Sequence, residues 1–205
     1  MGEHHTVASF DEDLGAISKL IADMGDLARS MVAGSTRALL NSDNALAQRV
    51  VSDDAIMDAR QRELDDRAIT LIAKRQPMAN DLRAVVGSIR MAGDLERIGD
   101  LAKNIGKRVT LTGDFHPQKL IRGVEHMAEL ALTQLKEVLD SYAAHDLGKA
   151  LAVWKGDEEV DALCTSLFRE LITYMMEDPR NITFCIHLMF CAKNIERIGD
   201  HATNI

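Results

Sequence analysis

Pairs of acidic residues four positions apart recur along the sequence. Each half of the chain contains two such pairs, and an asparagine follows the second pair of each half after four more residues. Like charges with this spacing repel each other on a helix and cost roughly 0.2–0.5 kcal/mol a pair. The spacing is unfavourable for stability alone and indicates a function for these residues: Asp54, Asp58, Glu96, Asp100 and Asn104, then Asp157, Asp161, Glu196, Asp200 and Asn204.

A multivalent cation between two adjacent helices would turn this repulsion into attraction. Carboxylate and amide oxygens are hard ligands that suit Mg²⁺, Mn²⁺ or ferric iron, and Zn²⁺ also accepts carboxylate. On a helix, Glu96, Asp100 and Asn104 form a drifting stripe, each about 40° on from the last. The ten residues are therefore predicted metal ligands, and the alternative that they are simply solvated stays open. His201 lies at the margin of the second stripe, where we favour a surface or packing role.

Other chemistry is poorly supported by the sequence. It contains no Walker loop, no nucleophile elbow, no His-Glu-x-x-His and no Glu-x-x-His of the buried di-iron type. Cys164, Cys185 and Cys191 form no CxxC motif and stand in apolar helical sequence, so we expect them to pack as small hydrophobic residues. The sequence thus predicts a protein without catalytic residues.

The elements that position the acidic residues are predicted to be helices. Apolar or small residues separated alternately by three and four positions predict a long helix near the start. The same stripe returns one hundred positions later, as do the phrases around Glu96 and Glu196, which indicates a duplicated unit. The stripes are Leu14, Ile17, Ile21, Met24, Ala28, Met31, Ser35 and Ala38, then Ile121, Val124, Ala128, Ala131, Leu135, Val138 and Tyr142.

Two further helices are predicted in each half, with a breaker-rich linker at 109–118 between the halves. Pro77 and Pro179 suit the first turn of a helix, and Asp178 is a plausible N-cap. Gly99 and Gly199, inside helices, suggest a close approach to the backbone. We therefore predict an all-α fold of two tandem, pseudo-symmetric three-helix bundles, with domains at 1–112 and 113–205 and further helices at about 43–75, 77–108, 146–178 and 179–205.

Composition narrows the location and the partners. The chain has 205 residues and a net charge of −8, which disfavours nucleic acid as a partner. The first residues lack the basic end and apolar run of a signal peptide, and no apolar run approaches the roughly 20 residues of a membrane span. We expect a cytoplasmic protein.

At this point the motifs themselves carry a resemblance. The segments "LERIGDLAKNI" and "IERIGDHATNI" resemble the paired signature of the PhoU family, accessory regulators of bacterial phosphate uptake. The segment "IAKRQPMANDLR" resembles the sequence before the first signature, and "LITYMMEDPRNI" with "FCAKNIERIGD" resembles the sequence that leads into the second. The resemblance runs from about Leu14 to the last residue.

The resemblance implies a fold and a role. PhoU proteins are tandem three-helix bundles, and members carry iron, zinc or other metals on [Asp/Glu]-x-x-x-Asp motifs, which match the ten residues named above. In this family the protein links the Pst phosphate ABC transporter, through its nucleotide-binding subunit, to the sensor histidine kinase PhoR. It keeps the phosphate-starvation response off when phosphate is plentiful, and reaches the membrane only through its partners.

Two expectations concern assembly and the last helix. An exposed duplicated face often pairs with itself, so we expect a homodimer. The family's last helix normally continues beyond the second signature, whereas this sequence stops one residue after Asn204. We therefore expect a truncated last helix whose metal ligands lie near a fraying end.

Two other functions stay open at this point. A metal-dependent phosphohydrolase would use bound cations to polarise phosphate, and the acidic pairs would hold the cations. A metal-buffering protein would need only the acidic pairs. Both are alternatives to the regulatory adaptor.

Overall fold

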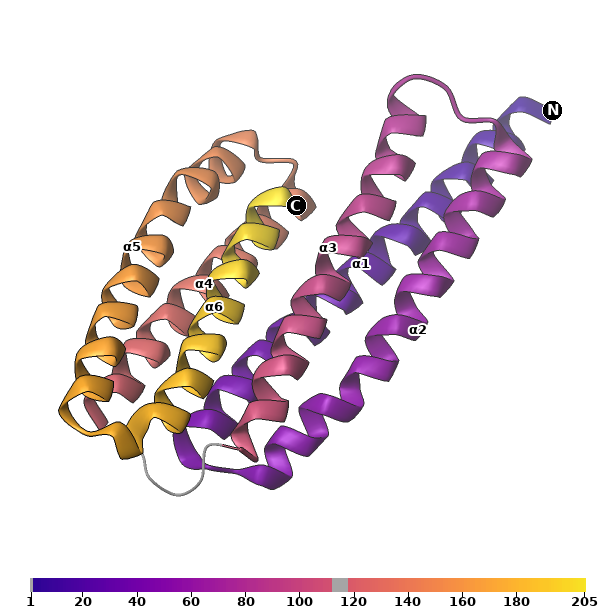
Figure 1. Ribbon diagram of the computed structural model, residues 1–205. Helices are drawn as coiled ribbons and strands as arrows, with labels where there is room; N and C mark the ends of the chain where they lie inside the picture. The colour runs from indigo at the N-terminus through magenta and orange to yellow at the C-terminus, as the bar shows by residue number, and fades with distance from the viewer. Residues whose placement is uncertain (1, 112–117) are drawn as a thin grey trace.

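The computed structural model describes residues 2–111 and 118–205, which form six α-helices and one short 3₁₀-helix (Figure 1). Helices α1 to α3 pack together as one bundle and α4 to α6 as a second, so the predicted all-α fold of two three-helix bundles is confirmed. The elements are α1 (Gly2–Asn41), α2 (Asn44–Arg75), α3 (Asn80–Val109), α4 (Gln118–Ala144), α5 (Leu147–Glu177), η1 (Pro179–Asn181) and α6 (Ile182–Asn204).

Short turns with matching chemistry join the first two helices of each bundle. The side chain of Asp43 accepts a hydrogen bond from the backbone N–H of Leu46 at 2.9 Å and caps α2. Asp146 does the same for α5, accepting from the N–H of Lys149 at 3.1 Å. A carboxylate at this position satisfies a backbone donor that the helix itself leaves free. Equivalent positions therefore begin equivalent helices in the two repeats.

Both predicted apolar stripes line the bundle cores. The members of the first stripe from Ile17 to Ala38 are buried, and Leu14 packs against the core from its edge. The second stripe is buried from Ile121 to Val138, with Tyr142 partly buried. All three cysteines are buried, as predicted. A β-carbon on Gly99 would lie 3.3 Å from Cγ of Met57, so this glycine lets α2 and α3 approach closely.

The two bundles meet where α3 packs against α6 and α1 against α4. Within the described ranges, α2 and α5 contact only elements of their own bundle. Contacts between α3 and α6 join Asp94 to His201 and Arg108 to His187, so the two helices run antiparallel. The seam thus lies between the helices that carry the two signatures, while α2 and α5 flank it on the outside.

Three details differ from the expectations or lie beyond the structure. Helix α3 begins at Asn80 rather than Pro77, because Ala79 has a positive φ of 50° that interrupts the helix. Asp178 caps η1 by accepting from the N–H of Arg180 at 3.0 Å, so the cap precedes a 3₁₀ turn rather than α6 directly. The predicted boundary at 112/113 falls outside the described residues.

No helix in the described part of the chain combines the length and the apolar character that crossing a bilayer requires.

Candidate functional site

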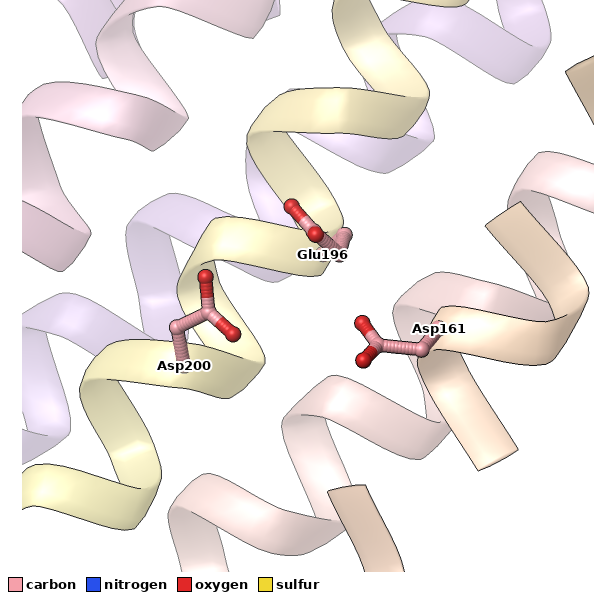
Figure 2. Close-up of side chains that lie close together, drawn as sticks. All are labelled: Asp161, Glu196 and Asp200. Atoms are coloured by element: carbon pink, nitrogen blue, oxygen red, sulfur yellow. The ribbon is translucent and has the colours of Figure 1, made fainter. Parts of the chain in front are cut away.

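The second repeat brings three of the predicted ligands together. Asp161 on α5 faces Glu196 and Asp200 on α6, and one carboxylate oxygen from each lies within 4.8 Å of the other two (Figure 2). Asp161 and Asp200 are exposed and Glu196 is half-buried. Among the described residues, this is the one group of three or more His, Cys, Asp or Glu side chains whose ligand atoms lie this close together. The cluster therefore joins residues of two neighbouring helices, α5 and α6.

One oxygen of this cluster has no hydrogen-bond partner. Oε2 of Glu196 is buried and makes no hydrogen bond, while Oε1 accepts one from Lys193 Nζ at 2.5 Å. Lys193 stands three residues before Glu196 on the same helix, and its side chain is 53% exposed. The hydrogen bond to Glu196, with lesser contributions from nearby charges, raises the pKa of Lys193 above its ordinary value. A buried oxygen without a partner is costly, and a cation at this position would remove the cost.

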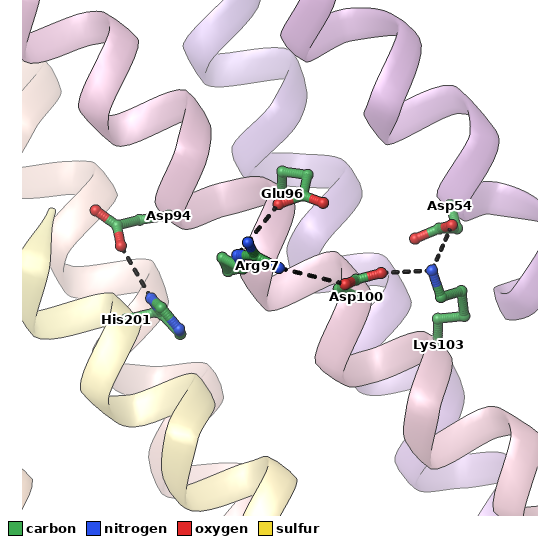
Figure 3. Close-up of polar contacts among 7 residues, drawn as sticks. All are labelled: Asp54, Asp94, Glu96, Arg97, Asp100, Lys103 and His201. Atoms are coloured by element: carbon green, nitrogen blue, oxygen red, sulfur yellow. Dashed lines mark hydrogen bonds and ion pairs between the residues drawn. The ribbon is translucent and has the colours of Figure 1, made fainter.

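In the first repeat a lysine ammonium lies between the carboxylates of the two helices. Nζ of Lys103 donates to Oδ2 of Asp54 on α2 at 2.7 Å and to Oδ1 of Asp100 on its own helix α3 (Figure 3). Lys103 is only 18% exposed, so its ammonium lies in the groove between the two helices. Burial alone would lower the pKa of Lys103, but the hydrogen bonds to Asp100 and Asp54 raise it further, and the net pKa is above the ordinary value. Lys103 therefore stays charged.

Negative charge remains concentrated around Glu96 in the first repeat. Burial, followed by the nearby charge of Asp100, raises the pKa of Glu96, and Arg97 lowers it by a smaller amount. Asp58 and Asp54 add further repulsion. Arg97 reaches Glu96 and Asp100 at 3.8 Å each, within its own helix (Figure 3). Burial and the neighbouring carboxylates thus make the ionised form of Glu96 less favourable than in water.

The counterpart of Lys103 in the second repeat carries no charge. Thr203 stands three residues after Asp200, as Lys103 stands after Asp100, and its hydroxyl donates to the backbone carbonyl of Asp200 at 2.8 Å. Asp157, the counterpart of Asp54, lies in α5, and its side chain falls outside the described part of the structure. The two repeats thus share their acidic residues, but only the first has a lysine at this position.

The remaining predicted ligands lie near these clusters. Asp58 is half-buried on α2, where its charge is felt by Glu96. Asn104 is half-buried on α3, and Asn204 is exposed at the last residue of α6.

A thiol adjoins the cluster of the second repeat. Cys164 lies on α5, one turn after Asp161, and is buried. Burial, then the charge of Glu196, raises the pKa of Cys164 to about 11, with Asp161 adding to the shift and Lys193 opposing it. At neutral pH this cysteine is therefore a protonated thiol and a poor nucleophile. The counterpart in the first repeat is Gln61, so the thiol is specific to the second.

Two contacts across the seam were missed by the sequence reasoning. Nδ1 of His201 donates to Oδ1 of Asp94 at 2.9 Å, which joins α6 to α3 (Figure 3). At the other end of the seam Arg108 lies 4.0 Å from the ring centroid of Phe190 and donates to Nδ1 of His187 at 3.1 Å. Burial, and then the Arg108 charge, lower the pKa of His187, which keeps it a neutral acceptor. His201 is thus a packing residue of the seam.

The donor set of the second repeat fits a hard cation. Three carboxylates from two helices converge there, one of them with an orphaned buried oxygen, and oxygen ligands suit Mg²⁺, Mn²⁺, iron or Zn²⁺. Bound there, a cation would neutralise the cluster and join α5 to α6. In the first repeat Asp100, the counterpart of Asp200, already shares the Lys103 ammonium with Asp54.

Comparison with a family model points to one group of proteins. A model of the PhoU domain matches residues 21–109 and 124–205, which together cover most of the chain. Each matched range contains one acidic cluster and one of the two signatures.

Individual relatives match over the full length of the chain. A protein of Rhizobium meliloti (strain 1021), "Phosphate-specific transport system accessory protein PhoU homolog", is 62% identical over 206 residues, covering 100% of this chain and 87% of that protein. A protein of the same name from Caulobacter vibrioides (strain NA1000 / CB15N) is 49% identical over 202 residues, covering 98% of this chain and 88% of that protein.

Solved structures show the same arrangement of helices. The crystal structure of PhoU from Pseudomonas aeruginosa superposes with a TM-score of 0.92 at 34% identity, covering 95% of this chain and 94% of that one. The phosphate transport system regulatory protein PhoU from Streptococcus pneumoniae gives a TM-score of 0.87 at 25% identity, covering 95% and 92%.

Proposed function

The chain belongs to the PhoU family, and on that premise we propose that it is a non-catalytic regulator of phosphate uptake. The observation that carries the proposal is the match of the PhoU domain model to both repeats, joined by relatives named as accessory proteins of the phosphate-specific transport system. In this role the chain acts as an accessory to the transporter and controls it through binding rather than turnover.

The finer part of the proposal concerns partners. The chain connects the nucleotide-binding subunit of the Pst transporter to the sensor histidine kinase PhoR and holds the starvation response off when phosphate is plentiful. It works in the cytoplasm as a homodimer and meets the membrane only through these partners. The support is the family resemblance of the two signatures, together with helices that lack the character of membrane spans within the described ranges.

Metal binding is the second part of the proposal. Iron or zinc, with Mg²⁺ or Mn²⁺ as alternatives, would be held by carboxylates on adjacent helices, most directly by Asp161, Glu196 and Asp200. A cation there would cancel the mutual repulsion of the three carboxylates and stiffen the contact between α5 and α6. Metal could then influence regulation only if the partners bind the metal-loaded and metal-free states with different affinities.

The regulatory role is tested by deleting the gene in its own host and measuring a phosphate-starvation reporter at high phosphate. We expect the reporter to become active in the deletion strain and to be silenced again by the wild-type chain. A silent reporter in the deletion strain would remove the regulatory proposal. Affinity capture from phosphate-replete cells should recover the transporter subunit and the kinase, and recovery of neither would refute the adaptor role.

A metal-dependent phosphohydrolase is the enzymatic alternative. The cluster of the second repeat could polarise a phosphate, but the thiol beside it, Cys164, is held protonated by a pKa of about 11 and cannot serve as a ready nucleophile. Purified protein supplied with Mn²⁺, Mg²⁺ or Zn²⁺ is expected to hydrolyse phosphate esters no faster than the metal alone. Hydrolysis that disappears in Asp200→Asn would instead establish the enzyme.

A further inference from the structure

We infer that Lys103 is a permanent internal counter-ion in the first repeat, so that this chain takes up metal only at Asp161, Glu196 and Asp200 of the second. The inference rests on the metal-binding part of the proposed function and refines it. Two acidic sites that look alike in sequence are thereby assigned different cations, an ammonium group in one and a metal ion in the other.

The position of the lysine is the first argument. Nζ of Lys103 lies between a carboxylate of α2 and a carboxylate of α3, bonded to Asp54 at 2.7 Å and also to Asp100. A metal ion held by the acids of the first repeat would compete with the lysine for Asp54 and Asp100, two of the predicted ligands there. It would also meet the ammonium charge at short range, in a groove where the lysine is only 18% exposed and solvent screens poorly. The first site is therefore closed to metal unless Lys103 leaves.

The tether of the lysine is the second argument. Lys103 bridges two helices, whereas Lys193, beside the second site, bonds to Glu196 on its own helix and is 53% exposed. An exposed lysine of this kind can turn into solvent at little cost, because surface ion pairs contribute little to stability. Lys193 therefore does not close the second site as Lys103 closes the first.

The third argument is the residue that replaces the lysine. Thr203 occupies the position of Lys103 and brings no positive charge, and its hydroxyl is directed to the carbonyl oxygen of Asp200. About two turns earlier on the same helix, Oε2 of Glu196 is buried without a hydrogen-bond partner. The second site thus combines converging carboxylates with an oxygen that lacks a donor, and a hard divalent or trivalent cation fits this combination.

Exchanging the two residues tests the inference. Metal-free wild-type protein, Lys103→Thr, Thr203→Lys and Thr203→Met are each titrated with Mn²⁺, with free Mn²⁺ followed by its paramagnetic resonance signal. The titrations are repeated with Zn²⁺ by calorimetry. We expect Thr203→Lys to weaken binding at least about tenfold, while Thr203→Met, which has similar length without charge, stays within about threefold of wild type. Lys103→Thr should gain additional metal.

Ligand variants assign each binding event to a repeat. In the wild-type background, Asp200→Asn should weaken binding at least about tenfold and Asp100→Asn should change it by less than about twofold, because the sites lie in separate bundles. In the Lys103→Thr background, Asp100→Asn should remove the added metal. If Lys103→Thr does not fold, Thr203→Lys and the two aspartate variants still test the inference.

The failures are distinguishable. Equal weakening by Asp100→Asn and Asp200→Asn in wild type would show metal at both sites and overturn the role of Lys103 while leaving metal binding intact. Unchanged binding in Thr203→Lys would overturn it as well. Absence of binding in wild type and in Lys103→Thr would refute metal binding itself, and the inference with it, while the regulatory role would still be judged by the reporter.

Discussion

The acidic sites of the two repeats share the same pattern of acidic residues and differ in the positive charge beside them. In the first, Lys103 joins Asp54 to Asp100 across the groove between α2 and α3. In the second, Thr203 stands in its place and three carboxylates converge between α5 and α6 with one buried oxygen unpaired. The comparison teaches that a repeated ligand motif does not guarantee a repeated site, because one residue outside the motif can change which cation the ligands hold.

The largest expected effect separates the two lysines by their contribution to stability. Lys103→Thr leaves Asp54 and Asp100 half-buried without their shared partner and should lower the free energy of unfolding by about 2 kcal/mol. The matched variant Lys193→Thr removes an exposed ion pair and should cost less than about 0.5 kcal/mol. Denaturant titrations with a chelator present measure both.

Similar losses in these two variants would contradict the comparison. It would mean that Lys103, between α2 and α3, contributes no more to the free energy of unfolding than Lys193 on the surface of α6. A loss for Lys103→Thr that is large with the chelator and small with metal present would indicate that a metal ion replaces the lysine.

A smaller effect is expected at the thiol beside the second site. Burial and the carboxylate of Glu196 hold the pKa of Cys164 at about 11, so Glu196→Gln should lower this pKa and speed alkylation at pH 8 about threefold. Peptide mass spectrometry after timed alkylation measures each cysteine separately. Glu96→Gln, the matching change in the first repeat, should leave the rate at Cys164 unaltered.

The other two cysteines provide the control for local opening. Cys185 and Cys191 are buried in α6, and their rates should not change in Glu196→Gln. A rise at all three positions would report general loosening of the bundle instead of a lowered thiol pKa. No rise at Cys164 would show that the carboxylate and the thiol are not coupled.

The smallest expected effect concerns the half-buried carboxyl of Glu96. Because burial and Asp100 raise the pKa of Glu96 in the folded protein, ionising this carboxyl weakens the fold as pH rises above the ordinary value of 4.5. Glu96→Gln should therefore stabilise the metal-free protein at pH 7 by roughly a few tenths of a kcal/mol. The gain should shrink as pH falls toward 4.5, where the wild-type carboxyl is protonated too.

Thermal or denaturant unfolding at pH 7 and pH 4.5 measures this difference, with the same two proteins at both values. An equal gain at both pH values would trace it to side-chain packing rather than charge. Destabilisation at pH 7 would show that the Arg97 and Glu96 pair outweighs the repulsion.

Regular features of the fold could be predicted from the sequence because they depend on spacing. The stripes from Ile17 to Ala38 and from Ile121 to Val138 follow the helical period, and their burial needs no knowledge of the neighbours. The start of α3 was misjudged because the positive φ of Ala79 has no marker in its residue type. The domain boundary and the ten ligands remain predictions.

The differences between the sites depended on contacts that spacing does not reveal. The i+3 relation of Lys103 to Asp100 was visible, but its reach to Asp54 depends on how α2 and α3 pack. A direct comparison of "LAKNI" with "HATNI" would have shown the exchange of lysine for threonine. The bond between Asp94 and His201 joins residues 107 positions apart in different repeats, so only the tertiary structure could show it.

Helix α6 touches different neighbours along two of its sides, and this has a mechanical consequence. Asp200 faces α5, whereas the next residue, His201, about 100° further around the axis, is bonded to Asp94 of α3. Because α6 is held on both sides, a rotation of the helix toward α5 also moves His201 relative to Asp94 on α3. Drawing α6 closer to α5 would therefore disturb the Asp94–His201 contact that joins the two bundles.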